Sequence, residues 1–342
     1  MAETLKKEQI LAVSQELLEL RPAVPAQLRL QRDVLGADPK HPDLLALAEK
    51  VRSSLPVRIL EQEQRGDGGW GAFHSRSTTA HQKTASTETA VERALSLGLD
   101  RACPILARAE AYLKALLKGE IRFPDYHEKN ERWPIGMRLF TASTLALIHP
   151  EHPLLDPDRA LWVEIVKRAF QSGAYCEEHE LAAHADLTVQ AVKNSYLIIN
   201  NRYTLNLVGS TRGLLPPAVE RTYMHWLWSL EEGIGYLGMP LGKEPPLDKP
   251  GPLDRWFTSL ERLLKLFPAS APLAEPWILW IWNRRKPGGW WDFGSRAVSS
   301  TSLPFADSWK RKGEREKDWS TRVLLLAWRW GSANAALSGQ AL

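Results

Sequence analysis

Hydrophobic residues recur at helical spacing along most of the chain, and polar stretches rich in glycine and proline separate the periodic segments. Apolar side chains three and four positions apart form one face of a helix, and proline or glycine ends such a segment. This pattern predicts about twelve helices and no strand. The predicted helices cover residues 5–20, 28–35, 41–51 with a continuation over 57–62 after Pro56, 88–97, 105–117, 136–148, 159–170, 187–199, 217–230, 253–267, 274–282 and 319–330.

One unusual polar segment occurs twice. Residues 66–76 and residues 287–296 share the letters Gly-Gly-Trp-x-x-Phe-x-Ser-Arg. Each copy is followed by a polar loop and then by a Ser-Thr pair, at residues 86–87 and 320–321, that opens an apolar helix. Two copies of such a unit in a helical chain predict a repeat architecture.

No charge run or low-complexity linker divides the chain. We therefore expect one domain over residues 1–342, with residues 1–40 as an N-terminal helical extension and residues 331–342 as a flexible tail. Long polar loops precede alternate helices, and a structureless stretch of about twenty residues is uncommon in a compact domain. These loops are therefore expected to carry function.

Composition narrows the classes of partner. The chain has 15 tryptophans in 342 residues, which is typical of an aromatic-lined cavity or of a thick helix-packing core, and both alternatives stay open. The net charge of +4 is small and evenly spread, so no nucleic acid is expected as a partner. Two cysteines fit a reducing, cytoplasmic compartment. The sequence has neither a signal-peptide pattern nor an apolar run of about 18 residues, so we expect no stable membrane insertion.

The first repeat unit carries a family resemblance. A helix, then Asp67-Gly68-Gly69-Trp70-Gly71, then a helix opened by Ser/Thr-Glu and followed by a second helix, resembles the repeat of the squalene–hopene cyclase and protein prenyltransferase β-subunit superfamily. The resemblance is closest over residues 62–98 and clear over residues 287–330. It implies an all-α fold, an α/α toroid whose long loops gather at one rim of a central cavity. Other helical toroids and an unrelated helical solenoid are the alternatives.

The resemblance also implies a candidate acid. Class II terpene cyclases of this superfamily carry Asp-x-Asp-Asp-Thr, whose middle Asp protonates an alkene, and the nearest match is residues 184–188, His-Ala-Asp-Leu-Thr. Asp186 and His184 are therefore the candidate catalytic residues. A cationic His184 would favour the carboxylate form of Asp186, which opposes proton donation. The alternative is that Asp186 or Thr188 caps the helix predicted to start here.

A metal site has weaker support. The prenyltransferases hold zinc with Asp, Cys and His, and Cys176 and His179 supply two of these residue types within one short stretch. Family ligands come from separate helices, so the spacing does not match, and a structural cysteine is the alternative. We expect no metal and no other cofactor, since P-loop, Rossmann, nucleophile-elbow and zinc-protease motifs are all missing from the sequence.

The candidate substrate-binding residues come from the two Gly-Gly-Trp loops and from the polar loop that ends near residue 133. Arginine captures phosphate or carboxylate and stacks on tryptophan, and aromatic faces stabilise cations. Alternatively, each arginine fixes its own loop by pairing with an aspartate or with backbone carbonyls. The predicted set is Trp70, Phe73, His74, Arg76, Arg132, Trp133, Trp290, Trp291, Asp292, Phe293 and Arg296.

Three functions remain open from the sequence. The first is a divergent terpene cyclase-like or prenyltransferase-like protein, an isomerase or lyase by resemblance only, that acts on or binds an apolar molecule in a Trp-lined central cavity. That molecule would be an isoprenoid or a similar compound, with or without an anionic head group. The second function is a non-catalytic ligand-binding or scaffold toroid. The third is a toroid carbohydrate-active enzyme that uses paired carboxylates.

Overall fold

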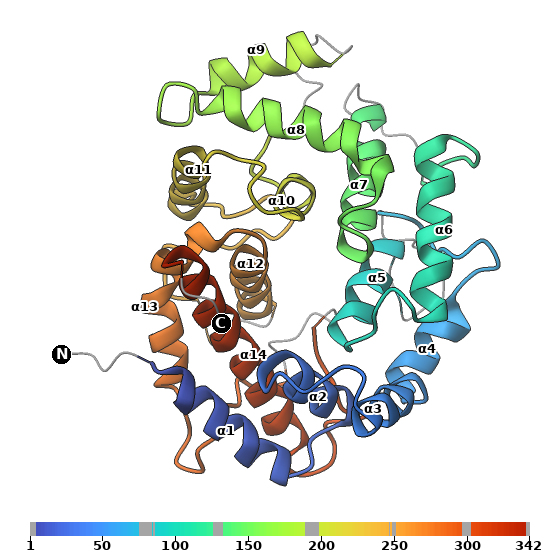
Figure 1. Ribbon diagram of the computed structural model, residues 1–342, viewed down its shortest axis with the longest axis vertical. Coiled ribbons are helices and arrows are strands. Elements are labelled where there is room, and N and C mark those ends of the chain that lie inside the picture. The colour runs from blue at the N-terminus through green and yellow to red at the C-terminus, as the bar shows by residue number, and fades with distance from the viewer. Residues whose placement is uncertain are drawn as a thin grey trace. The chain divides into compact units, whose positions relative to one another are not determined.

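The computed structural model describes residues 5–74, 84, 86–125, 133–188, 198–245, 247, 251–295 and 302–339 (Figure 1). Within these residues the chain forms fourteen α-helices and isolated bridges but no strand, which confirms the prediction of an all-α protein. The helices are α1 (Lys7–Glu19), α2 (Val24–Arg29), α3 (Pro42–Arg52), α4 (Leu55–Glu63), α5 (Thr87–Ser96), α6 (Pro104–Lys118), α7 (Trp133–Ile148), α8 (Asp156–Ala169), α9 (Glu177–Leu187), α10 (Arg202–Gly209), α11 (Pro217–Ser229), α12 (Pro252–Leu266), α13 (Ala271–Trp282) and α14 (Glu314–Leu337).

Most helix ends follow from local chemistry. Pro104, Pro217 and Pro252 each occupy the first position of a helix, where the missing N–H costs no hydrogen bond. Gly119 ends α6 in the left-handed conformation, at φ 72°, as glycine does after many helices. A short π-helical segment, η1 (Leu30–Val34), continues α2, so the helix predicted over residues 28–35 begins earlier than its apolar pattern indicated.

The helix predicted over residues 187–199 is wrong at its start. Residue 187 ends α9, and the Thr188 hydroxyl donates to the His184 carbonyl at 2.6 Å. Three glutamates in the first turn of α9 stabilise it through the helix dipole, a signal that the apolar pattern did not contain. Residues 189–197 lie outside the described part of the chain. The short helix α10 was not predicted at all.

The last helix is longer than predicted. Residues 331–337, expected to be part of a flexible tail, continue α14 to Leu337. Trp330 is buried and its indole N–H donates to the Ala271 carbonyl at 3.1 Å, while Ala333 one turn later is also buried. Packing against the start of α13 therefore extends the helix beyond the point where the strongly apolar residues stop.

Contacts between Cα atoms divide the chain into two compact units. Unit 1 consists of Met1–Gln62, Glu92–Leu99 and Pro246–Leu342. Unit 2 consists of Glu63–Val91 and Asp100–Pro245. The single domain and the closed toroid both stay predictions.

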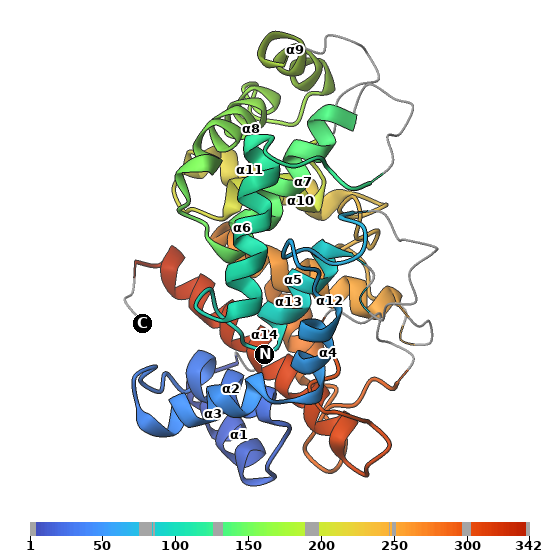
Figure 2. The same ribbon diagram turned by 90° about the vertical axis from the view of Figure 1, so that its right-hand side faces the viewer.

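The helix α14 is the centre of unit 1. It contacts α1, α12 and α13, which surround it in Figures 1 and 2. Trp319 and Leu324 on α14 are fully buried. Arg322 is buried with them and is paired with Asp254 at 2.5 Å and Glu261 at 2.8 Å, both on α12. A buried cation is tolerable here because both carboxylates compensate its charge.

Unit 2 is organised around α7, α8 and α10. The seven residues from Tyr203 to Gly209 on α10 are all buried, and α10 contacts both α7 and α8. Asn201 caps α10, since its side-chain oxygen accepts from the N–H groups of Tyr203 and Thr204, each at 2.9 Å. This cap fixes the start of α10, and with it the side chains of Arg202 and Tyr203.

Candidate functional site

The first Gly-Gly-Trp turn is fastened to the start of α5. Trp70 is fully buried, its backbone N–H donates to Thr87 Oγ1 at 2.9 Å, and that hydroxyl donates to the Trp70 carbonyl at 2.8 Å. Gly68 has a φ of 96°, and a Cβ atom there would lie 2.3 Å from the Arg108 carbonyl oxygen. Glycine is therefore required at this point, both by the backbone conformation and by the close approach of α6.

The chain beyond the turn is held by one carboxylate. Asp125 accepts the backbone N–H of Phe73 at 2.5 Å and that of His74 at 2.8 Å. The Phe73 ring is fully buried and lies 4.9 Å from the Phe123 ring. The backbone of His74 is thus fixed before its side chain makes any contact.

The His74 side chain meets a polar cluster built from three distant segments. His74 Nδ1 lies 3.1 Å from Glu88 Oε1, in the first turn of α5, and 2.8 Å from the hydroxyl of Tyr203. Tyr203 donates to Glu88 Oε2 at 2.9 Å. Arg202 Nη2 donates to the same carboxylate oxygen at 2.5 Å and to the Tyr203 hydroxyl at 2.9 Å. We call His74, Glu88, Arg202 and Tyr203 the His74 cluster.

One arrangement of protons satisfies all of these contacts. In it the Tyr203 hydroxyl donates to Glu88 and accepts from Arg202, and His74 Nδ1–H donates to the Glu88 carboxylate. In this tautomer His74 Nε2 carries the lone pair, and it forms no hydrogen bond within the part of the chain that is described. Burial raises the pKa of Tyr203 well above its ordinary value, and the Glu88 carboxylate raises it further. Tyr203 therefore stays a neutral donor at neutral pH.

Aromatic rings surround the imidazole. Phe140 stacks on His74 with a centroid distance of 4.3 Å and an angle of 22°. Tyr236 meets it edge-on at 5.5 Å and is half exposed. The side chain of His74 is 19% exposed and that of Glu88 only 4%. A histidine that solvent reaches, backed by a buried carboxylate, is the arrangement that general bases use.

The second turn repeats the geometry of the first, displaced by one residue from the alignment of letters. Trp291 is fully buried and its backbone N–H donates to Ser320 Oγ at 3.1 Å, as that of Trp70 does to Thr87. Trp290 is only half-buried. Trp291, and not Trp290, is therefore the counterpart of Trp70.

The polar groups of the second turn are occupied with fixing the loop. Asp292 accepts two hydrogen bonds from Arg315, both 2.8 Å long, and one from Lys286 at 3.0 Å. Burial alone would raise the pKa of Asp292, but the hydrogen bonds from Arg315 and Lys286 hold it well below its ordinary value. The Phe293 ring packs against Trp319 at 5.2 Å. These contacts favour the structural interpretation of Asp292 and Phe293.

The two predicted catalytic residues lie in different surroundings. His184 is buried on α9, where Nε2 is 3.6 Å from Glu180 Oε1 and the ring meets Trp162 edge-on. The Asp186 side chain is 69% exposed and pairs with Arg168 at 2.9 Å. The alternative interpretation made Asp186 the cap at the start of a helix. Asp186 instead lies in the last turn of α9. An exposed, cation-paired carboxylate suits a surface ion pair better than proton donation to an alkene.

The other predicted residues divide into two groups. Cys176 precedes α9 as its N-cap residue and His179 lies in its first turn. In the described ranges, the group of three metal-ligand side chains within reach of one another does not include either residue. Arg76, Arg132 and Arg296 lie outside the described residues, as does the side chain of Trp133, whose backbone begins α7.

Sequence reasoning found His74 but missed its partners. Glu88 entered the prediction only as the glutamate that follows the Ser-Thr pair at the start of a helix, and Arg202 and Tyr203 were not among the candidate residues. The one available signal was the acidic residue directly after Thr87 in the first repeat, because the second repeat has Thr321 after Ser320.

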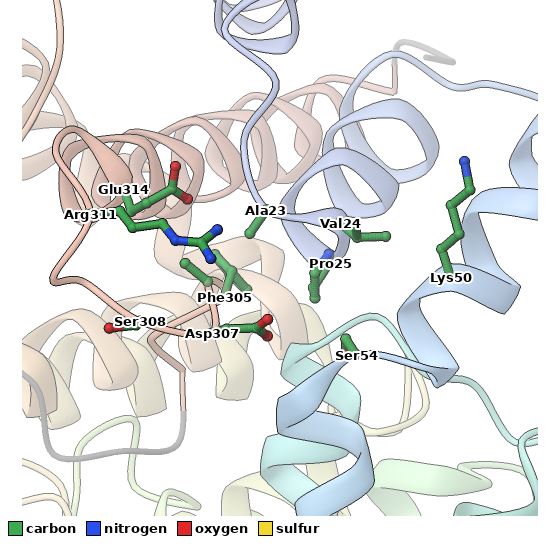
Figure 3. A pocket seen from close by; sticks show the side chains of 11 residues that line it. Ala23, Val24, Pro25, Lys50, Ser54, Phe305, Asp307, Ser308, Arg311 and Glu314 are labelled. Carbon is green, nitrogen blue, oxygen red and sulfur yellow. The ribbon is translucent and has the colours of Figure 1, made fainter.

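Unit 1 contains a separate cavity of about 250 Å³. It is formed by the start of α2, by α3 and by the loop before α14. Figure 3 shows Arg311 and Asp307 on one side of it and Lys50 on the other. No predicted site residue lines it, and its charges are of both signs.

Comparison of the chain with protein-family models, with curated proteins and with solved structures found no match. Across the described segments, the helices lack the combination of length and apolar character that crossing a bilayer requires.

Proposed function

We propose that the His74 cluster is an acid–base site that acts on a largely apolar small molecule. The observation that carries this proposal is the pairing of His74 Nδ1 with the buried carboxylate of Glu88, which leaves Nε2 as the working atom. The Glu88 carboxylate holds the ring and its tautomer and stabilises the imidazolium that forms when Nε2 accepts a proton.

The surroundings of His74 support an apolar substrate. Phe140, Tyr203 and Tyr236 place aromatic rings within 6 Å of the imidazole centroid. Aromatic faces stabilise positive charge, including that of a carbocation. A base among such rings suits the removal of a proton from the carbon next to a cationic centre, with the C–H electrons forming a double bond. This is an isomerase-type or lyase-type step on an isoprenoid or a similar molecule.

Arg202 is not proposed to bind an anionic head group. Its guanidinium lies 2.5 Å from Glu88 Oε2, so its charge already compensates that carboxylate. A role in binding an anion stays with Arg76, Arg132 and Arg296 as a prediction. The family membership, the α/α toroid and a cytoplasmic location belong to the same proposal, supported by the Gly-Gly-Trp turns and by the thiols of Cys103 and Cys176, which form no disulfide.

A non-catalytic ligand-binding protein is the second candidate. It is favoured because the polar side chains of the His74 cluster bond to one another, with Glu88 accepting hydrogen bonds from three neighbours. The same bonds fasten the first turn to α5 and α10. In that case the aromatic rings would hold a ligand and His74 would be structural.

Turnover separates the two candidates. The purified protein is incubated with farnesyl diphosphate, geranylgeranyl diphosphate and squalene, and products are measured by mass spectrometry. His74→Asn is compared with His225→Asn, a surface histidine on α11 of the same unit. We expect His74→Asn to lower turnover by about 100-fold or more, the usual contribution of a general base, while the control keeps full activity.

Ligand binding without turnover by the wild-type protein would instead favour the second candidate. Wild-type protein that neither binds nor converts any of these compounds, and that carries no co-purified lipid in native mass spectrometry, would contradict both candidates.

A further inference from the structure

A second group of chemically active side chains lies elsewhere in unit 2. Glu110 comes from α6, His149 directly follows α7, and His152 precedes the short 3-10 helix η2 (Pro153–Leu155). One ligand atom from each residue lies within 4.8 Å of those of the other two. We call these three residues the Glu110 cluster. None of them takes part in the His74 cluster.

The geometry of the Glu110 cluster is already close to that of a ligand set. His149 Nδ1 lies 3.0 Å from Glu110 Oε1, and the two imidazole rings are 5.0 Å apart at 87°. His152 Nδ1 accepts the Leu154 N–H at 3.1 Å, which fixes that ring and leaves Nε2 for a ligand. In a zinc site with bonds of about 2.0–2.2 Å, the ligand atoms lie about 3–3.5 Å apart. The farthest pair of ligand atoms would therefore need to approach by at most about 1.5–2 Å.

Rigid elements carry two of the three groups. The helices α6 and α7 pack against each other, and Figure 2 shows them side by side. Glu110 lies in the middle of α6, and His149 donates its backbone N–H to the Leu145 carbonyl at 2.8 Å, which continues the hydrogen bonding of α7. Preorganised donors lower the cost of assembling a metal site.

Nearby charges have to be considered because they oppose a cation. Lys114 Nζ lies 3.7 Å and Arg101 Nε 3.9 Å from the Glu110 carboxylate. The Arg101 side chain is 55% exposed and that of Lys114 35%, so both can swing into solvent when an ion neutralises Glu110.

A metal ion binds an ionised carboxylate and neutral imidazoles. At this cluster it would therefore replace the proton that Glu110 and His149 share in their 3.0 Å contact.

We propose that Glu110, His149 and His152 bind one divalent transition-metal ion, with zinc as the expected ion. Two imidazole nitrogens and one carboxylate oxygen form a donor set that zinc accepts, and three protein ligands leave one coordination position open. The alternative is an ion pair between Glu110 and His149 beside a histidine that caps η2, which would bind no metal.

The test is metal titration of the full-length protein after chelator treatment. Zinc affinity is measured by competition with a chromophoric chelator, and cobalt binding by the visible absorption of four-coordinate cobalt. We expect the wild-type protein to bind one equivalent of zinc. His149→Ala, His152→Ala and Glu110→Gln should each weaken binding by at least about 10-fold, as loss of even an outer hydrogen-bond partner does. His225→Ala is the matched control and should bind zinc as the wild type does.

Two results would overturn the proposal. One is that the wild-type protein binds no more zinc per chain than the double variant His149→Ala/His152→Ala. The other is a double variant that is folded by circular dichroism and keeps the wild-type zinc affinity. Glu110→Gln keeps the shape of the side chain, so it remains informative if an alanine variant fails to fold.

Discussion

The two Gly-Gly-Trp turns place a tryptophan in the same way, yet the side chains that come after that tryptophan have different roles. In each turn the indole of one tryptophan is fully buried, and the backbone N–H of that tryptophan donates to a hydroxyl in the next helix. The hydroxyl belongs to Thr87 for Trp70 and to Ser320 for Trp291. An aspartate accepts two consecutive backbone N–H groups in each unit, but at different places. Asp125 binds Phe73 and His74 of the first turn, whereas Asp318 binds Phe305 and Ala306, beyond the second turn. The tryptophan and its hydroxyl partner are thus the part of the scaffold that the two turns share.

The difference lies in the side chains that the scaffold presents. The first turn leads to His74, which meets Glu88. In the register set by the tryptophans, the second turn has Ser295 and Thr321 at these positions. The Thr321 hydroxyl only donates to the Lys317 carbonyl at 2.9 Å within α14. A repeated structural unit therefore carries a histidine–glutamate pair in one copy and none in the other, so the proposed acid–base chemistry depends on these two positions and not on the motif.

The largest expected effect tests the register of the two turns. Trp70→Ala and Trp291→Ala should each lower the free energy of unfolding by about 3–5 kcal/mol, the usual cost of emptying a buried aromatic site. Trp290→Ala should cost much less, because Trp290 is only half-buried. Chemical denaturation measures all three. If Trp290→Ala lowered the free energy of unfolding more than Trp291→Ala, Trp290 and not Trp291 would be the counterpart of Trp70, as the aligned letters suggest.

The next effect tests the difference between the turns. Glu88→Gln removes the charge that compensates Arg202 and should lower the free energy of unfolding by about 3 kcal/mol, as breaking a largely buried ion pair does. Thr321→Ser, at the equivalent position in unit 1, keeps its hydroxyl and serves as the control, with an expected change below about 1 kcal/mol. Equal losses for the two variants would mean that Glu88 has no special structural role.

The smallest effect concerns the aspartate of unit 1. Burial raises the pKa of Asp318 to about 6, although hydrogen bonds from Trp309 and from two backbone N–H groups lower it. A carboxyl whose pKa is raised in the folded state binds a proton on folding, so its contribution to stability is lost as the pH rises from about 4 through 6. Asp318→Asn should abolish this dependence and gain up to about 2–3 kcal/mol relative to the wild type near pH 7.

The measurement for Asp318 is the free energy of unfolding as a function of pH. Asp307→Asn, at an exposed position in the same loop, is the control. Parallel pH profiles for the wild-type protein and Asp318→Asn would contradict a raised pKa at Asp318.

Sequence patterns located most of the helices and both turns, and the errors have physical causes. The start of α9 was missed because its first turn is acidic and not apolar, while α10 is too short to show a periodic pattern. The register of the second turn was misjudged because two tryptophans are adjacent and only burial distinguishes them. The loop arginines predicted to bind substrate lie outside the described residues, so their role stays a prediction.

The sequence by itself determined the helical class, the glycine-dependent turns and the proline starts of several helices, because each depends on hydrogen bonds and steric limits within a few residues. Only the tertiary structure decided that His74 meets a tyrosine 129 positions away and that Glu110 meets a histidine 39 positions away. Such contacts depend on how helices pack against one another, and packing is set by the shapes of whole apolar faces. For the same reason Asp186, which matched a motif in letters, lies on the surface, while Glu88, which was not predicted to be a site residue, lies 3.1 Å from the imidazole Nδ1 of His74.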